Sequence, residues 1–206
     1  MTVRQTVLRT VYPLWMFFSR SSGNTSKVLV NLKNIQPLQP FYNLSVQLNN
    51  GTTLSFDSLK GRKILLVNTA SDCGYTNQYS DLQKLHEQYH DVLTVIGFPA
   101  NDFKEQEKGS DDEIRNFCEI NYGVTFPLAL KGSVARSNHQ QNVFQWLTDK
   151  TKNGWNNHPP SWNFSKYLVS EEGVLMNYFG PAVSPLSKEV KMAIERQPSG
   201  GNISIW

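Results

Sequence analysis

The stretch "NTASDCGYT", residues 68–76, holds one of only two cysteines in a chain of 206 residues. Cys73 follows the apolar run "KILLV", which predicts a strand buried on both faces, and precedes a helical pattern that starts near Thr76. Reactive groups gather beyond the carboxyl ends of strands in open α/β sheets, and a helix N-terminus supplies N–H groups that favour a thiolate. Cys73 is therefore a candidate nucleophile.

The ordinary role of a lone cysteine is that of a small apolar residue, which here would fill the end of a strand. The polar neighbours Ser71 and Asp72, together with Gly74, argue against that role. Thr76 stands three positions after Cys73, where a dithiol exchange protein of the thioredoxin kind needs its second sulfur. A lone thiolate suits attack on something other than a disulfide, and peroxide oxygen is the obvious candidate.

The elements that must position this cysteine alternate in type from about Phe41 onward. Periodicity and turn signals predict a hairpin made of "FYNLSVQL" and "TTLSF", three strands at "KILLVNTA", "VLTVIGFP" and "FPLAL", and a closing hairpin made of "NFSKYLV" and "VLMNYFG". Helical spacing predicts helices over residues 76–89, 110–121, 140–150 and 187–196, the second opened by a Ser110–Glu113 capping box. This order is typical of an α/β fold with a mixed sheet flanked by helices.

Length and composition favour one soluble domain over residues 41–206, because a chain of this size with 39% hydrophobic residues can bury a single sizeable core. The net charge of +3 is spread along the chain, so nucleic acid is not an expected partner. His86 and His90 lie one helical turn apart, but no third ligand stands at recognisable spacing. We therefore expect neither a metal nor a cofactor.

Residues 1–40 differ from the rest, with an apolar patch of about ten residues flanked by arginines and then a small-residue linker. The patch is too short to span a bilayer, and Arg9 and Pro13 interrupt it. We expect a loosely ordered tail or a weak membrane-surface anchor. An export or targeting segment, or a real part of the fold, are the alternatives. A cytoplasmic location is expected, with a membrane-associated or exported protein as the other possibility.

Three motifs resemble the glutathione peroxidase family and together cover roughly residues 41–195. "VNTASDCGYTNQY" is similar to the family's peroxidatic-cysteine motif, with Cys73 where members carry selenocysteine or cysteine. "GFPANDFKEQEKG" and "PSWNFSKYLV" follow in the family's order. The resemblance implies a thioredoxin-like fold, a non-selenium peroxidase, and a catalytic tetrad of Cys73, Gln106, Trp162 and Asn163.

The residue types suit peroxide reduction, because the side chains of Gln106, Trp162 and Asn163 donate hydrogen bonds at any ordinary pH. Taken singly, Gln106 is typical of a solvated loop, Trp162 of a core or rim, and Asn163 of a turn. Their joint match to the family gives them the catalytic role.

The chain also departs from the family's pattern. Ala100 replaces a cysteine that many members carry, Asp102 replaces the following glutamine, and Lys104 stands where glycine is common. A carboxylate at Asp102 would oppose a nearby thiolate unless it faces solvent.

Cys118 lies in a position similar to the resolving cysteine of thioredoxin-dependent members. The alternative is an inert buried thiol, because Ile114, Phe117 and Cys118 share one helix face. The short segment before Trp162, without basic residues that match glutathione contacts, favours a monomer reduced by a thioredoxin-like protein rather than by glutathione. Hydrogen peroxide and organic hydroperoxides are the expected substrates, and a response to oxidative stress the expected role. A redox sensor that passes oxidation to a partner protein and a degenerate binding module are the alternatives.

Overall fold

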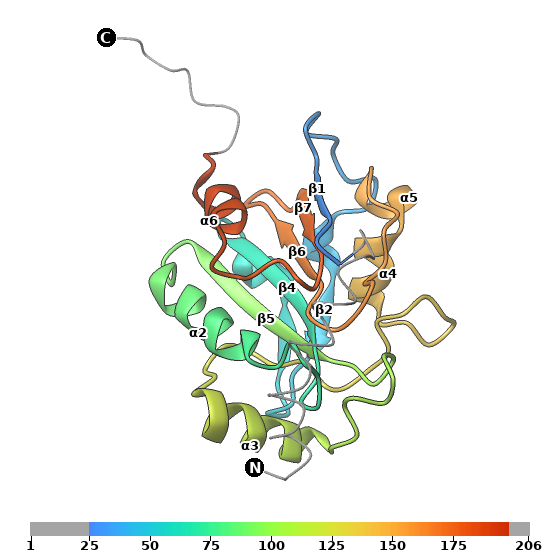
Figure 1. Ribbon diagram of the computed structural model, residues 1–206. Helices are drawn as coiled ribbons and strands as arrows, with labels where there is room; N and C mark the ends of the chain where they lie inside the picture. The colour runs from blue at the N-terminus through green and yellow to red at the C-terminus, as the bar shows by residue number, and fades with distance from the viewer. Residues whose placement is uncertain (1–24, 198–206) are drawn as a thin grey trace.

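The computed structural model describes residues 25–197, and its centre is a five-stranded mixed sheet in the order β1-β7-β6-β4-β5. The strands are β1 (Val28–Val30), β4 (Lys63–Thr69), β5 (Leu93–Pro99), β6 (Lys166–Val169) and β7 (Leu175–Phe179). β4 and β5 run parallel, while every other pairing in this sheet is antiparallel (Figure 1). The parallel pair brings the carboxyl ends of both strands to one edge, where Cys73 follows β4.

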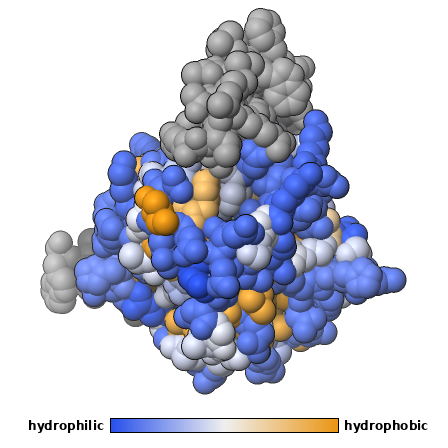
Figure 2. Space-filling view, turned by 90° about the horizontal axis from the view of Figure 1, so that it is seen from below, coloured by the Kyte–Doolittle hydropathy of each residue, from blue (hydrophilic) through white to orange (hydrophobic). Residues whose placement is uncertain are grey.

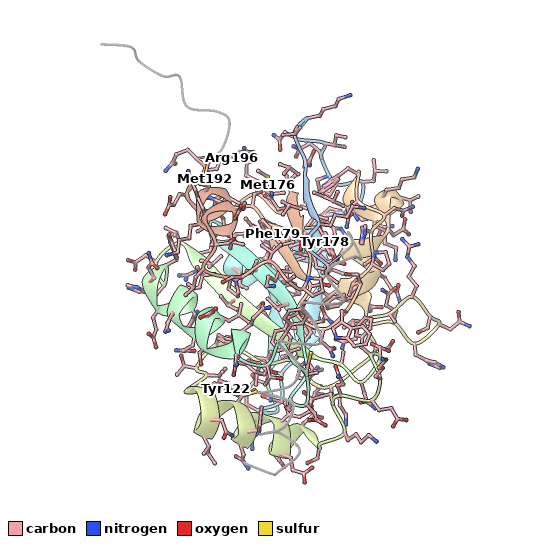
Figure 3. The ribbon with its side chains drawn as sticks, in the orientation of Figure 1. Tyr122, Met176, Tyr178, Phe179, Met192 and Arg196 are labelled. Carbon is pink, nitrogen blue, oxygen red and sulfur yellow. The ribbon has the colours of Figure 1, made fainter. Side chains whose placement is uncertain are left out.

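Helices cover both faces of the sheet, which confirms the predicted thioredoxin-like α/β architecture (Figure 1). The helices are α2 (Gln78–Gln88), α3 (Asp111–Tyr122), α4 (Asn142–Thr148), α5 (Lys150–Asn153) and α6 (Lys188–Glu195). Successive β4 residues divide between two cores: Ile64 packs on the side of α4, and Leu65 on the side of α2 and α6. The neighbours Tyr178 and Phe179 of β7 divide in the same way (Figure 3).

The predicted first hairpin is present as β2 (Ser45–Gln47) paired with β3 (Thr53–Ser55). Gly51 closes its turn with a φ of 85°, a conformation that favours glycine. Two 3-10 turns, η1 (Phe41–Asn43) and η2 (Phe56–Leu59), flank the hairpin and bury Phe41 and Phe56 against each other. The closing hairpin is β6 and β7, as expected.

The "FPLAL" segment is not a regular strand, contrary to the prediction. It makes isolated bridges, Leu128 to Gly97 of β5 and Ala129 to Leu48 beside β2. Pro127 has no N–H to donate, so a continuous ladder cannot form through it. The segment instead ties the small hairpin to the edge of the main sheet.

The expected boundary at residue 40 also differs from the structure. β1 lies within the segment expected to be a tail, yet it pairs with β7 in the register Val28 to Phe179 through Val30 to Asn177. The folded domain therefore includes at least residues 28–30, because β7 would otherwise be an open sheet edge. The anchor or targeting role expected for the apolar patch falls on residues 1–24, outside the described range. No helix within residues 25–197 has the length and apolar character needed to cross a membrane.

Candidate active site

Cys73 lies in the turn that leaves β4, in the loop before α2. The hydroxyl of Thr76 closes this turn: its Oγ1 accepts from the backbone N–H of Cys73 at 3.0 Å and lies 2.6 Å from the carbonyl oxygen of Cys73. The residue that replaces a second sulfur is therefore a structural cap. The backbone N–H of Tyr75 donates to Cys73 Sγ at 3.4 Å, which is the kind of main-chain donor that the sequence predicted for the start of this helix.

Cys73 is only 6% exposed, and burial raises the pKa of its thiol to about 11. The N–H of Tyr75 and the donor groups of Asn163 and Trp162 act against this rise in pKa, while the charge of Asp72 adds to it. Two members of the predicted tetrad thus act directly on the electrostatics of the sulfur. The chemistry that follows is nucleophilic, with donors placed where negative charge develops.

Trp162 and Asn163 lie in the turn before β6. The indole packs on Phe103 with ring centroids 5.6 Å apart, and the ammonium of Lys104 lies 5.7 Å from the indole centroid. Trp162 Nε1 is buried and forms no hydrogen bond of ordinary geometry within the described part of the chain, so its N–H influences the Cys73 sulfur without a formed bond to it. A buried donor without a partner is costly and favours a bound acceptor, such as a peroxide oxygen or a thiolate.

Gln106 joins this group through two contacts. Its Oε1 accepts from Asn163 Nδ2 at 2.9 Å, and its backbone carbonyl accepts from the N–H of Asp72 at 3.0 Å. The two residues before it, Lys104 and Glu105, have φ angles of 51° and 52°. The left-handed backbone at Lys104 is a conformation that favours glycine, which fits the family motif that the stretch resembles, where glycine is common at this position.

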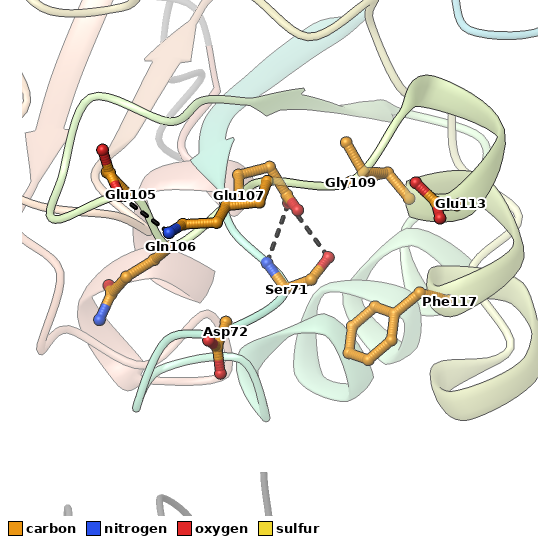
Figure 4. A pocket seen from close by; sticks show the side chains of 10 residues that line it. Ser71, Asp72, Glu105, Gln106, Glu107, Gly109, Glu113 and Phe117 are labelled. Carbon is orange, nitrogen blue, oxygen red and sulfur yellow. Dashed lines mark hydrogen bonds and ion pairs between the residues drawn. The ribbon is translucent and has the colours of Figure 1, made fainter. Parts of the chain in front are cut away.

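Glu107 is a buried carboxylate that the sequence did not single out. It is 1% exposed, and its Oε2 accepts from both the N–H and the hydroxyl of Ser71, at 2.9 and 3.1 Å (Figure 4). Burial raises the pKa of Glu107 to about 7, while the two bonds from Ser71 lower it. These contacts fasten the loop that carries Gln106 to the loop that carries Cys73. The only indication in the sequence of a role for Glu107 was its position directly after Gln106.

A pocket of about 320 Å³ opens beside these loops and is closed on its far side by α3 (Figure 4). Its walls come from two residues before Cys73, from the loop of Gln106 and from α3: Ser71, Asp72, Glu105, Gln106, Glu107, Lys108, Gly109, Glu113, Ile114 and Phe117. Cys73 itself is not a wall residue. Seen from below, the visible surface is mostly hydrophilic with small separate apolar patches (Figure 2).

Cys118 lies on the inward face of α3 and is fully buried, as its helix position predicted. It belongs to the same apolar cluster as Cys73, and both cysteines are free thiols. Burial raises the pKa of Cys118 to about 12, although the neighbouring Tyr79 hydroxyl partly offsets this. Cys118 is therefore unreactive in this conformation.

Asp102 does not act on the sulfur, which agrees with the solvent-facing alternative that the sequence left open for it. Its carboxylate accepts from the Ser133 hydroxyl at 2.9 Å and from the backbone N–H of Val134 at 2.7 Å. Asp102 therefore stabilises the loop after "FPLAL" and is exposed to solvent. Its charge does not contribute to the shift in the pKa of Cys73. Within residues 25–197, no three histidine, cysteine or carboxylate side chains gather as a metal site would require.

Comparisons with known proteins agree with the family resemblance of the sequence motifs. Residues 41–148 match the family model described as "Glutathione peroxidase". The chain is 41% identical over 153 residues to "Glutathione peroxidase homolog BsaA" of Staphylococcus aureus (strain MW2), covering 74% of this chain and 96% of the relative. It is 38% identical over 159 residues to "Glutathione peroxidase-like peroxiredoxin 2" of Saccharomyces cerevisiae, covering 76% and 98%.

Two solved structures show the fold. The apo crystal structure of "Trgpx" superposes with a TM-score of 0.57 at 28% identity, covering 77% of this chain and 97% of that one. A thiol:disulfide interchange protein of the thioredoxin family from Chlorobium tepidum TLS superposes with a TM-score of 0.54 at 17% identity, covering 78% and 97%. The second likeness concerns the fold alone.

Proposed function

This chain belongs to the glutathione peroxidase family, as a cysteine-containing thiol-dependent peroxidase, and from that premise we propose that Cys73 is the residue that attacks the hydroperoxide. Gln106, Trp162 and Asn163 then serve as hydrogen-bond donors to the sulfur and to the oxygen that leaves. The observation that carries the proposal is the Tyr75 N–H that donates to the buried Cys73 sulfur, beside Asn163 and Trp162, whose donor groups lower the pKa of that thiol.

The first step forms a bond between Cys73 Sγ and the terminal oxygen of the hydroperoxide while the O–O bond breaks. Sulfur is oxidised to a sulfenic acid and the peroxide is reduced to water or an alcohol. The pKa of Cys73 is about 11, so the resting thiol carries its proton at neutral pH. Because the thiolate is the attacking species, this proton must leave Sγ before the S–O bond forms, and it is the proton that the leaving oxygen takes up, so the step balances. The buried Trp162 N–H is the donor available to the developing oxygen charge.

Recycling requires a thiol reductant. We assign Cys118 as the residue that attacks the Cys73 sulfenic acid, giving a disulfide and water, and a thioredoxin-like protein as the dithiol that reduces the disulfide. Only Ile114 and Cys118 of the twelve residues of α3 are buried, so the helix is held by a narrow face and can open locally. The Ser110–Glu113 capping box and the left-handed C-cap at Gly123 stabilise the helical state to which the segment returns.

The test mixes reduced protein with hydrogen peroxide or an alkyl hydroperoxide. One arm supplies thioredoxin and its reductase, and the other supplies glutathione and its reductase. We expect sustained turnover in the thioredoxin arm and much slower turnover with glutathione. Rapid turnover with glutathione alone would reject the proposed reductant. Oxidation of Cys73 without turnover in either arm would instead favour a sensor that oxidises a partner protein, and no reaction with peroxide would favour a binding module.

A further inference from the structure

Asn68, near the carboxyl end of β4, is bonded on three sides to the turn that carries Trp162 and Asn163. Its Nδ2 donates to the carbonyl oxygen of Trp162 at 3.1 Å, and its Oδ1 accepts from the N–H of Ser165 at 3.0 Å. Its backbone oxygen accepts from the N–H of Phe164 at 2.6 Å. One residue of the strand that leads to Cys73 therefore fixes the turn that faces Cys73.

The turn needs such a restraint because Phe164 has a φ of 66°. A bulky residue with a β-carbon rarely adopts this left-handed conformation, and it persists only where its surroundings hold it. Lys166 holds the turn from the other side, since its buried Nζ donates to the carbonyl oxygen of Phe164 at 2.7 Å. The side chain of Asn68 is itself fully buried, so water cannot replace its bonds.

We propose that Asn68 is a positioning residue for hydroperoxide reduction, which holds Trp162 and Asn163 in the geometry that presents their donors to Cys73. The inference rests on the proposed function, and the side-chain hydrogen bonds of Asn68 go to the Trp162 turn and not to the sulfur. Without the side-chain amide, the Phe164 turn relaxes and the two donors lose their fixed distance from the sulfur. Misplacement of a catalytic group by about 1 Å can reduce a rate on the order of a hundredfold.

Asn31 is a matched control, because it is another buried asparagine whose side chain hydrogen-bonds to backbone groups. Its Nδ2 donates to the carbonyl oxygens of Ile35 and Leu175, and its Oδ1 accepts from the N–H of Ile35. Asn31 follows β1 at the far edge of the sheet. Asn31→Ala therefore removes a similar set of buried hydrogen bonds without touching the Trp162 turn.

The experiment compares Asn68→Ala with Asn31→Ala by two readouts in the full chain. The first is the rate constant for oxidation of Cys73 by hydrogen peroxide in stopped flow. We expect it to fall on the order of tenfold to a hundredfold in Asn68→Ala and to stay within about twofold of wild type in Asn31→Ala. In a Trp162→Phe background the Asn68→Ala effect shrinks, because both changes act on the same donor.

The second readout is ¹⁹F NMR of protein labelled with 5-fluorotryptophan, which needs no peroxidase activity. Asn68→Ala is expected to shift the Trp162 resonance, whereas Asn31→Ala shifts that of Trp155, whose Nε1 shares the Leu175 carbonyl with Asn31. Asn68→Ser replaces Asn68→Ala if the alanine variant fails to fold. Wild-type oxidation in a folded Asn68 variant, or slow oxidation with an unmoved Trp162 resonance, would overturn the inference. A wild-type protein inert to peroxide would overturn the proposed function instead.

Discussion

The side-chain amide of Asn163 donates a 2.9 Å hydrogen bond to Gln106 Oε1, joining two residues that lie 57 positions apart. Because Gln106 uses its oxygen for this bond, its Nε2 is the group left to donate elsewhere. The bond thus orders two donors relative to each other before substrate arrives. Such preorganisation is what makes donors effective toward charge that develops during a reaction.

Removing a donor should slow the first oxidation without unfolding the protein. We expect Trp162→Phe and Gln106→Ala each to reduce the rate constant for Cys73 oxidation on the order of ten- to a thousandfold. Stopped-flow measurement with excess hydrogen peroxide checks this. Trp155→Phe is the control, because its indole donates to the Leu175 carbonyl away from the site. Equal rates in wild type and both donor variants would remove these residues from the mechanism.

Glu107 should make stability depend on pH. Its pKa is about 7 in the folded protein against 4.5 when exposed, so between these values the folded state binds the extra proton. The contribution of Glu107 to the free energy of unfolding is therefore greatest below about pH 4.5. It is lost as the pH rises through about 7, and the loss is on the order of 3 kcal/mol. Urea unfolding of wild type and Glu107→Gln at pH 5 and 8 measures it. The glutamine variant should lack this component, and identical pH profiles would refute the assignment.

The capping box of α3 should control how fast the disulfide forms. Ser110→Ala removes the cap and destabilises the helix by about 1 kcal/mol, which raises its open population roughly fivefold. We expect disulfide formation between Cys73 and Cys118 to accelerate by a similar factor after one equivalent of peroxide. Ser187→Ala removes the matching cap of α6 and should leave this rate unchanged. An unchanged rate in Ser110→Ala would show that α3 need not open.

Cys118→Ser should separate the two halves of the cycle. The first oxidation keeps its rate, because the helix thiol takes no part in it, while turnover with thioredoxin is lost. Cys73 then remains a sulfenic acid and becomes prone to overoxidation to the sulfinic acid. Mass spectrometry of the variant after repeated peroxide additions checks this. Undiminished thioredoxin-dependent turnover would remove Cys118 from the cycle.

Hydrophobic periodicity was sufficient to predict the central strands, most helices and the loop position of Cys73, because these depend on local pattern and burial. The Ser110 cap was also readable, since its partners lie within one helical turn. Three features depend on contacts between distant segments and could not be read this way. β1 is a strand only because it pairs with β7. The Asp102 carboxylate accepts a hydrogen bond from a loop some thirty residues away. The hydrogen bond from Asn68 to the Trp162 carbonyl forms only when β4 and the Trp162 turn lie together.

The most direct test of the central claim is to locate the first oxygen that peroxide delivers. Reduced Cys118→Ser protein is treated with one equivalent of hydrogen peroxide in the presence of dimedone, which traps sulfenic acids, and the labelled peptide is identified by mass spectrometry. We predict one dimedone adduct, on Cys73, and none in Cys73→Ser, which should also lose all thiol-dependent peroxide consumption while keeping its fold. An unlabelled Cys73, or peroxide consumption by Cys73→Ser at the wild-type rate, would contradict the account.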